Sequence, residues 1–156
     1  MESNSFTIRI VGDWAPCDRD VVTLIKGGRL IMNIEGPILI GGSALFGSSQ
    51  KAGPSMSNRA IPNASQPGIA ILANNHLMDF GEAGLTSTID LLQNFGWLIS
   101  GAGLNKQQAE TSIVFGWAGR RAALISRCET QFGVASTTKP GVAAFDPTIY
   151  QQIREL

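Results

Sequence analysis

Three short apolar segments, each followed by side chains that bear hydrogen-bond acceptors, constrain the fold of this 156-residue chain most. The segments are Phe6–Val11, Leu30–Ile34 and Ile69–Ala73. The first alternates apolar and polar residues, and the other two are apolar over most of their length, as buried strands are. Because a helical pattern follows the third segment, the sequence predicts a mixed α/β fold in which these strands are neighbours in one parallel sheet.

The helix after the third strand is expected because apolar residues recur there at helical spacing. Its predicted apolar face consists of Leu85, Ile89, Leu92 and Phe95. Segment 36–57 is rich in Gly, Ser and Pro and is predicted to be a long loop. The other expected elements are a short helix at 21–26, a strand at 97–99, a hairpin of 112–117 with 121–126, and a helix at 147–156 with Ile149, Ile153 and Leu156 apolar.

The ends of the three predicted strands carry most of the chemistry that the sequence offers. In chain order these residues are Asp13, then Asn33 and Glu35, then Asn74, Asn75, His76 and Asp79. Because the carboxyl ends of parallel strands meet at one edge of a sheet, we expect these side chains to converge. Carboxylates, amide oxygens and imidazole suit hard or borderline divalent metals, so a two-metal hydrolytic site is predicted.

Two residues have more specific expected roles at this edge. Glu35 has the chemistry to bridge two cations about 4 Å apart. His76 could donate a proton to a leaving group once an acidic partner fixes its tautomer, and Asp79 lies three residues later.

Each of these residues also has a purely structural interpretation. Asp13 could cap the turn after its strand, and Glu35 could be a solvated turn residue before Gly36-Pro37. Asn74 and Asn75 could serve only to tolerate left-handed turn geometry, and a single histidine is often just a hydrogen-bonded surface or core group. Asp79 could cap the next helix.

Composition excludes several classes of function. Lys plus Arg equals Asp plus Glu at 12 each, and charged residues make up 15% of the chain, against about 25% in typical soluble domains. No nucleic-acid partner is therefore expected. The N-terminus lacks a basic leader region and no apolar run could cross a bilayer, so we expect a soluble, cytoplasmic chain without a membrane segment. Cys17 and Cys128 indicate neither a disulfide framework nor a zinc site, and Cys17 is given no role.

Four short blocks, in this order and spacing, resemble the CapA family of bacterial capsule and poly-gamma-glutamate synthesis proteins. They are Gly12-Asp13, Asn33-Ile34-Glu35-Gly36-Pro37, Ala73-Asn74-Asn75-His76-Leu77-Met78-Asp79-Phe80-Gly81 and Gly101-Ala102-Gly103. The last block lacks the third glycine of a dinucleotide fingerprint, with Lys106 in its place, so a Rossmann site is rejected.

The resemblance implies a layered α/β/β/α fold similar to that of calcineurin-like metallophosphoesterases. It implies Asp13, Glu35 and Asn75 as ligands of divalent metal ions, which could be manganese, zinc or iron, and His76 as the catalytic histidine. The expected function is a metal-dependent, phosphoesterase-like hydrolase of capsule or poly-gamma-glutamate synthesis, with a polyanionic or phosphorylated substrate.

Two departures from the family pattern leave alternatives open. Ala15 stands where many metallophosphoesterases have a histidine that helps to hold the first metal, and no counterpart of the family's further histidine motifs follows. We therefore expect residues 6–156 to form the N-terminal half of the domain, with apolar surface that favours self-association. The alternatives are a truncated, non-enzymatic binding or assembly component and a general metal-dependent phosphatase or phosphodiesterase.

Overall fold

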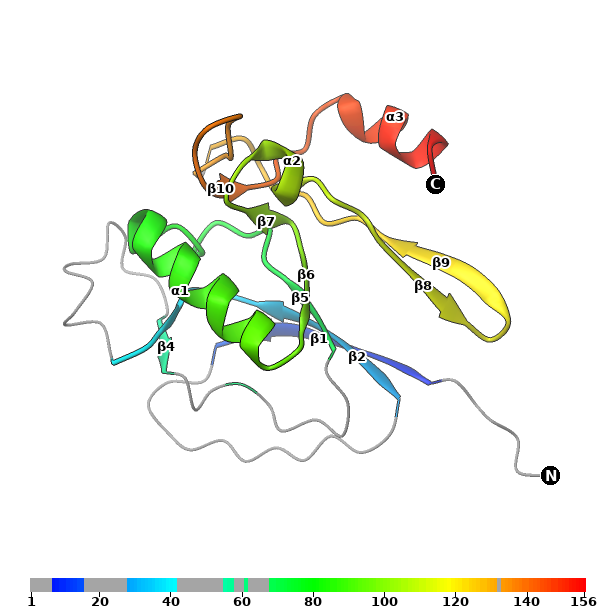
Figure 1. The fold of residues 1–156 in the computed structure, drawn as a ribbon, viewed down its shortest axis with the longest axis horizontal. Helices are drawn as coiled ribbons and strands as arrows, with labels where there is room; N and C mark the ends of the chain where they lie inside the picture. Colours follow the sequence, from blue (N-terminus) through cyan, green and yellow to red (C-terminus); the bar gives the residue numbers. More distant parts are fainter. Residues whose placement is uncertain (1–6, 16–27, 42–54, 58–60, 62–67, 132) are drawn as a thin grey trace.

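A four-stranded parallel sheet is the centre of the fold. The computed structural model describes residues 7–15, 28–41, 55–57, 61, 68–131 and 133–156. The sheet consists of β1 (Ile8–Trp14), β2 (Arg29–Ile34), β5 (Ile69–Ile71) and β6 (Leu98–Ser100), in the spatial order β1-β2-β5-β6 (Figure 1). All three pairings are parallel. The predicted mixed α/β fold with the three strands side by side in a parallel sheet is confirmed.

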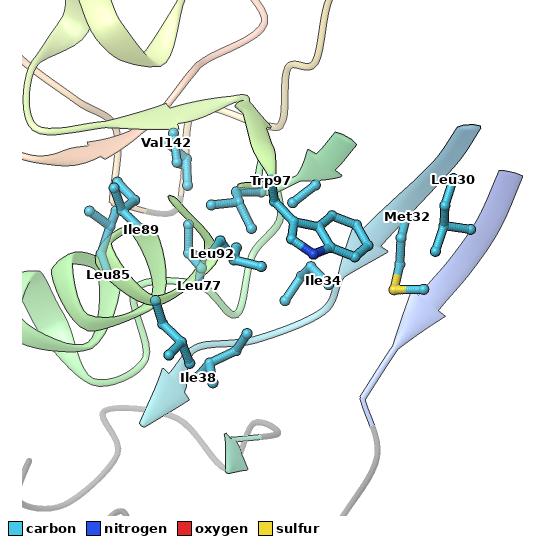
Figure 2. Packing of buried hydrophobic residues seen from close by; sticks show 14 residues of the cluster. Leu30, Met32, Ile34, Ile38, Leu77, Leu85, Ile89, Leu92, Trp97 and Val142 are labelled. Atoms are coloured by element: carbon cyan, nitrogen blue, oxygen red, sulfur yellow. The ribbon is translucent and has the colours of Figure 1, made fainter. Parts of the chain in front are cut away.

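Helix α1 (Gly81–Asn94) covers one face of the sheet (Figure 1). Its buried residues Leu85, Ile89 and Leu92 belong to one apolar cluster with residues of β2 and β5 and the residue directly after β5 (Figure 2). These are Leu30, Met32, Ile34, Ala70 and Leu72. Burying one such leucine or isoleucine contributes about 1.5–3 kcal/mol. This cluster therefore fixes α1 against the strands whose ends carry the candidate site.

The assignment of Phe95 to the buried face of this helix was wrong. The helix ends at Asn94, and the Phe95 side chain is 56% exposed. Gly96 has a φ of +76°, a left-handed conformation that redirects the chain into β6. Trp97, directly after that glycine, is the aromatic residue that is buried in the cluster instead (Figure 2).

A β-hairpin, β8 (Ile113–Trp117) with β9 (Arg120–Leu124), packs on the other face of the sheet. Ile113 at its base is buried with Ile31 and Ile69 of the sheet in a second cluster. Ala118 and Gly119 form its two-residue turn, and both have positive φ, as turns of type I′ require. The predicted hairpin is confirmed, and its outer end projects away from the body (Figure 1).

Several short elements complete the described part of the chain. They are β3 (Ile38–Leu39) paired with β4 (Met56–Ser57), β7 (Ala102–Gly103) paired with β10 (Gly141–Val142), α2 (Lys106–Ala109) and α3 (Thr148–Arg154). The prediction that 36–57 is only a loop was wrong, because β3 and β4 form a parallel pair within it. The helix expected at 21–26 lies outside the described residues. None of the described helices is long and apolar enough to cross a lipid bilayer.

Candidate functional site

The carboxyl ends of β1 and β2 bring two carboxylates to one amide. Strand β1 continues to Trp14, three residues beyond the predicted end, and its register with β2 shifts between Val11 and Trp14. Asp13 lies at this irregularity, and such irregularities in strands are common next to functional sites. The Asn33 Nδ2 atom donates to Asp13 Oδ1 at 2.8 Å and to Glu35 Oε2 at 2.6 Å. Asp13, Asn33 and Glu35 therefore form one connected group at the edge of the sheet.

Asn74 connects the loop after β5 to the end of β2. Its buried side chain donates from Nδ2 to the carbonyl oxygen of Ile34 at 2.7 Å and lies 3.4 Å from Asn33 Oδ1. Its Oδ1 atom accepts from the backbone N–H groups of His76 at 3.1 Å and Leu77 at 2.9 Å. A single side chain thus fixes the His76 loop relative to the two carboxylates.

Two of the structural interpretations of this loop are wrong. Among the described residues, Ala118 is the only non-glycine residue with positive φ, so Asn74 and Asn75 do not adopt left-handed geometry. Phe80 is the N-cap residue directly before α1, and no side chain makes a capping hydrogen bond there, so Asp79 does not cap this helix.

The Asp79 carboxylate is paired with the histidine instead. Asp79 is 2% exposed, and its Oδ2 atom lies 2.8 Å from His76 Nδ1. When the Asp79 carboxylate is ionised it can only accept, and the hydrogen of the pair then sits on Nδ1 of the imidazole. The His76 side chain is 25% exposed, so the rest of the ring remains accessible from solvent. Asn75 precedes it and is half-buried.

Gly101 is a site-supporting residue whose physical role the sequence did not reveal. Its φ is +91°, and a Cβ atom there would lie 2.6 Å from Ala73 Cβ and 2.6 Å from Ser126 Oγ. The backbone of the turn after β6 therefore passes directly against the residue that precedes Asn74. The Gly-Ala-Gly block was the available signal, and close backbone approach is its reason.

The comparison with known families covers all of these residues. The family model described as bacterial capsule synthesis protein PGA_cap matches residues 12–154. The chain belongs to this family. No curated protein matches the sequence. Every candidate site residue of this PGA_cap chain, from Asp13 to Asp79, lies inside the matched region.

The side chains of this PGA_cap chain fit an open site for one hard divalent cation better than a site in which protein side chains supply every ligand. Asp13 and Glu35 converge on one position, which a donor of partial positive charge, the Asn33 amide nitrogen, occupies. In the part of the chain that the structure describes, no three Asp, Glu, His or Cys residues are grouped for metal binding. Two carboxylates completed by water suit magnesium or manganese, which need few protein ligands or keep several waters.

Proposed function

We propose that this PGA_cap chain carries a metal-dependent, phosphoesterase-like hydrolase site that acts in capsule or poly-gamma-glutamate synthesis. One observation supports the hydrolase part most directly. The carboxylates of Asp13 and Glu35 bond to Asn33, and Asn33 contacts Asn74, which accepts from the loop of His76 and Asp79 at the same edge of the sheet. Family membership supports the connection with capsule synthesis.

Asp13 and Glu35 would hold the divalent cation, with Asn75 as the further donor that the CapA resemblance implies. Of manganese, zinc and iron, the carboxylate and amide oxygens favour manganese, because zinc and iron are bound more often through nitrogen or sulfur. When bound, the cation would supply charge stabilisation for a phosphoryl oxygen and a water that ionises more readily than free water.

His76 would act as the proton donor to the leaving group. Because Asp79 accepts the hydrogen on Nδ1, proton transfer to a substrate falls to the other ring nitrogen, Nε2. Asp79 is buried and also receives its position from the loop itself, since its backbone N–H donates to the His76 carbonyl oxygen at 3.0 Å. The pair is therefore oriented before any substrate binds.

The substrate class that fits this chemistry is a phosphorylated or polyanionic molecule, because the cation and the histidine both act on a developing negative charge. A general phosphatase or phosphodiesterase would use the same side chains and differ only in substrate. A non-enzymatic binding or assembly component is favoured by Ala15, which provides no imidazole beside Asp13.

The test combines metal binding with turnover. Purified protein is treated with chelator, titrated with manganese, zinc or iron by calorimetry, and assayed with bis(p-nitrophenyl) phosphate. We expect wild-type protein to bind manganese and to hydrolyse the ester, and the variant with Asp13→Ala and Glu35→Ala to lose both. The matched control carries Glu82→Ala and Asp90→Ala, two exposed acidic residues of α1, and should keep both.

The other outcomes separate the candidate functions. Manganese binding without turnover of this or other phosphate esters would favour the binding or assembly component. If neither the wild-type protein nor the control binds any of the three metals, the proposed site is wrong.

A further inference from the structure

We propose that Asn33 is a built-in competitor of the metal: its amide nitrogen occupies the position between Asp13 and Glu35 that the cation takes. This inference rests on the proposed function, because it concerns the same metal. Asn33 thereby sets how tightly the site binds its cation, without being a ligand itself.

The orientation of the Asn33 amide follows from its neighbours. Asn74 Oδ1 accepts two backbone N–H groups, which can only donate, so Asn74 must direct its Nδ2 atom at Ile34 O and Asn33. Asn33 then presents its oxygen to Asn74 and its nitrogen to the carboxylates. The two hydrogens of Asn33 Nδ2 are used by Asp13 Oδ1 and Glu35 Oε2, one each.

This arrangement explains how the two carboxylates stay close together. Glu35 lies two residues after Asn33, directly after the end of β2, and Asp13 comes from the neighbouring strand β1. Both are acceptors when ionised, and two like charges bonded to the same nitrogen atom repel each other. A donor between them forms two charge-assisted hydrogen bonds, which are stronger than neutral ones.

The same arrangement opposes Asn33 as a metal ligand. To offer its oxygen to a cation, the amide would have to turn over, and its nitrogen would then face the Nδ2 atom of Asn74, donor against donor. Turning over would also break both bonds to the carboxylates. A cation between Asp13 and Glu35 therefore displaces the Asn33 side chain. The hydrogen bonds lost in this displacement reduce the affinity of the site for the cation.

The test is manganese titration by calorimetry of chelator-treated wild-type protein, Asn33→Ala and Asn33→Ser. We expect both variants to bind manganese more tightly than wild type, on the order of tenfold. The reason is that the pair of hydrogen bonds from Asn33 to the two carboxylates no longer competes with the cation. Serine keeps a polar side chain, but its hydroxyl group has one hydrogen to donate and cannot bridge both carboxylates. If the alanine variant does not fold, the serine variant decides the test. Asn94→Ala, at the exposed end of α1, is the matched control and should bind as wild type does.

A second measurement needs no metal. In excess chelator, the loss of thermal stability caused by Asn33→Ser should be smaller in a Glu35→Gln background, because one charge-assisted bond and the carboxylate repulsion are already absent. Additive effects of the two substitutions would overturn the bridging role of Asn33.

The metal titration distinguishes this inference from the proposed function. Unchanged or weaker manganese binding in the Asn33 variants, with normal binding by wild type, would overturn the inference and leave the metal site in place. An absence of metal binding by all proteins would reject the metal site itself, and this inference with it.

Discussion

His76 Nδ1 and Asp79 Oδ2 lie 2.8 Å apart, and the carboxylate of this pair is almost completely shielded from solvent. If His76 donates a proton during turnover, Asp79→Asn should lower kcat for bis(p-nitrophenyl) phosphate by about 10²–10⁴. The reason is that an amide can also donate, and it then no longer holds the hydrogen on Nδ1. Steady-state kinetics with manganese-loaded protein measure this loss.

The role of Asp79 is positioning, so its loss should leave metal affinity unchanged. Asp90→Asn on the exposed side of α1 is the control and should keep the wild-type kcat. A kcat equal to wild type in Asp79→Asn would contradict the assignment of His76 as proton donor. A parallel loss of manganese binding would instead indicate that Asp79 only maintains the loop.

Gly101→Ala should destabilise the protein by about 2–5 kcal/mol, from a strained positive φ and from overpacking against Ala73 and Ser126. Urea unfolding followed by circular dichroism measures the change. Gly116→Ala is the matched control, since no atom lies within 4 Å of its Cβ position and its φ is not positive. Its stability should stay within about 0.5 kcal/mol of wild type. Equal stability of the two variants would contradict the close approach at Gly101.

The sequence could predict the central sheet because its strands are apolar segments that the polar candidate residues follow directly. Leu30–Ile34 and Ile69–Ala73 are apolar segments long enough to be recognised, and parallel strands necessarily present their carboxyl ends at one edge. This rule alone places Asp13 and Glu35 on the edge that Asn74 also joins. The two-residue strands β3, β4, β7 and β10 could not be predicted, because such short pairs form only where tertiary partners provide them.

The detailed geometry of the site was less accessible to sequence. An asparagine in a polar loop is equally typical of a turn, and nothing local indicates that Asn74 donates to a carbonyl oxygen 40 residues away. The Asn33 side chain likewise bonds to Asp13 in β1 and to Glu35 directly after β2. For Phe95 the sequence predicted too much, because the helical spacing of apolar residues extends to Phe95 although the chain turns at Gly96.

Gln152→Ala should loosen α3 from the rest of the protein. No residue of α3 is buried, and its attachment is polar. Gln152 Nε2 donates to Ser112 Oγ at 2.7 Å and to the Glu110 carbonyl oxygen, and its Oε1 accepts from the buried guanidinium of Arg127. Since each lost bond contributes about 0.5–1.5 kcal/mol, hydrogen exchange of the α3 amides should accelerate by roughly tenfold or more.

The neighbouring glutamine is the matched control for this experiment. The exposed side chain of Gln151 donates from Nε2 to Glu155 Oε1 at 2.8 Å, and Glu155 is the residue directly after α3. Gln151→Ala should leave the exchange rates of α3 close to those of wild type. Similar acceleration in both variants would show that the contacts of Gln152 do not hold the helix.

Cys128 should react slowly with alkylating reagents. Burial raises the pKa of its thiol, and the negative charge of Glu129 raises this pKa further, so less thiolate is present at a given pH. In a Cys17→Ser background, the rate of iodoacetamide modification should rise with pH along a curve displaced to higher pH than that of the urea-unfolded chain. Glu129→Gln should move the curve back toward lower pH, whereas Glu82→Gln on α1 should not. A folded-state midpoint at or below that of the unfolded chain would contradict the effect of burial.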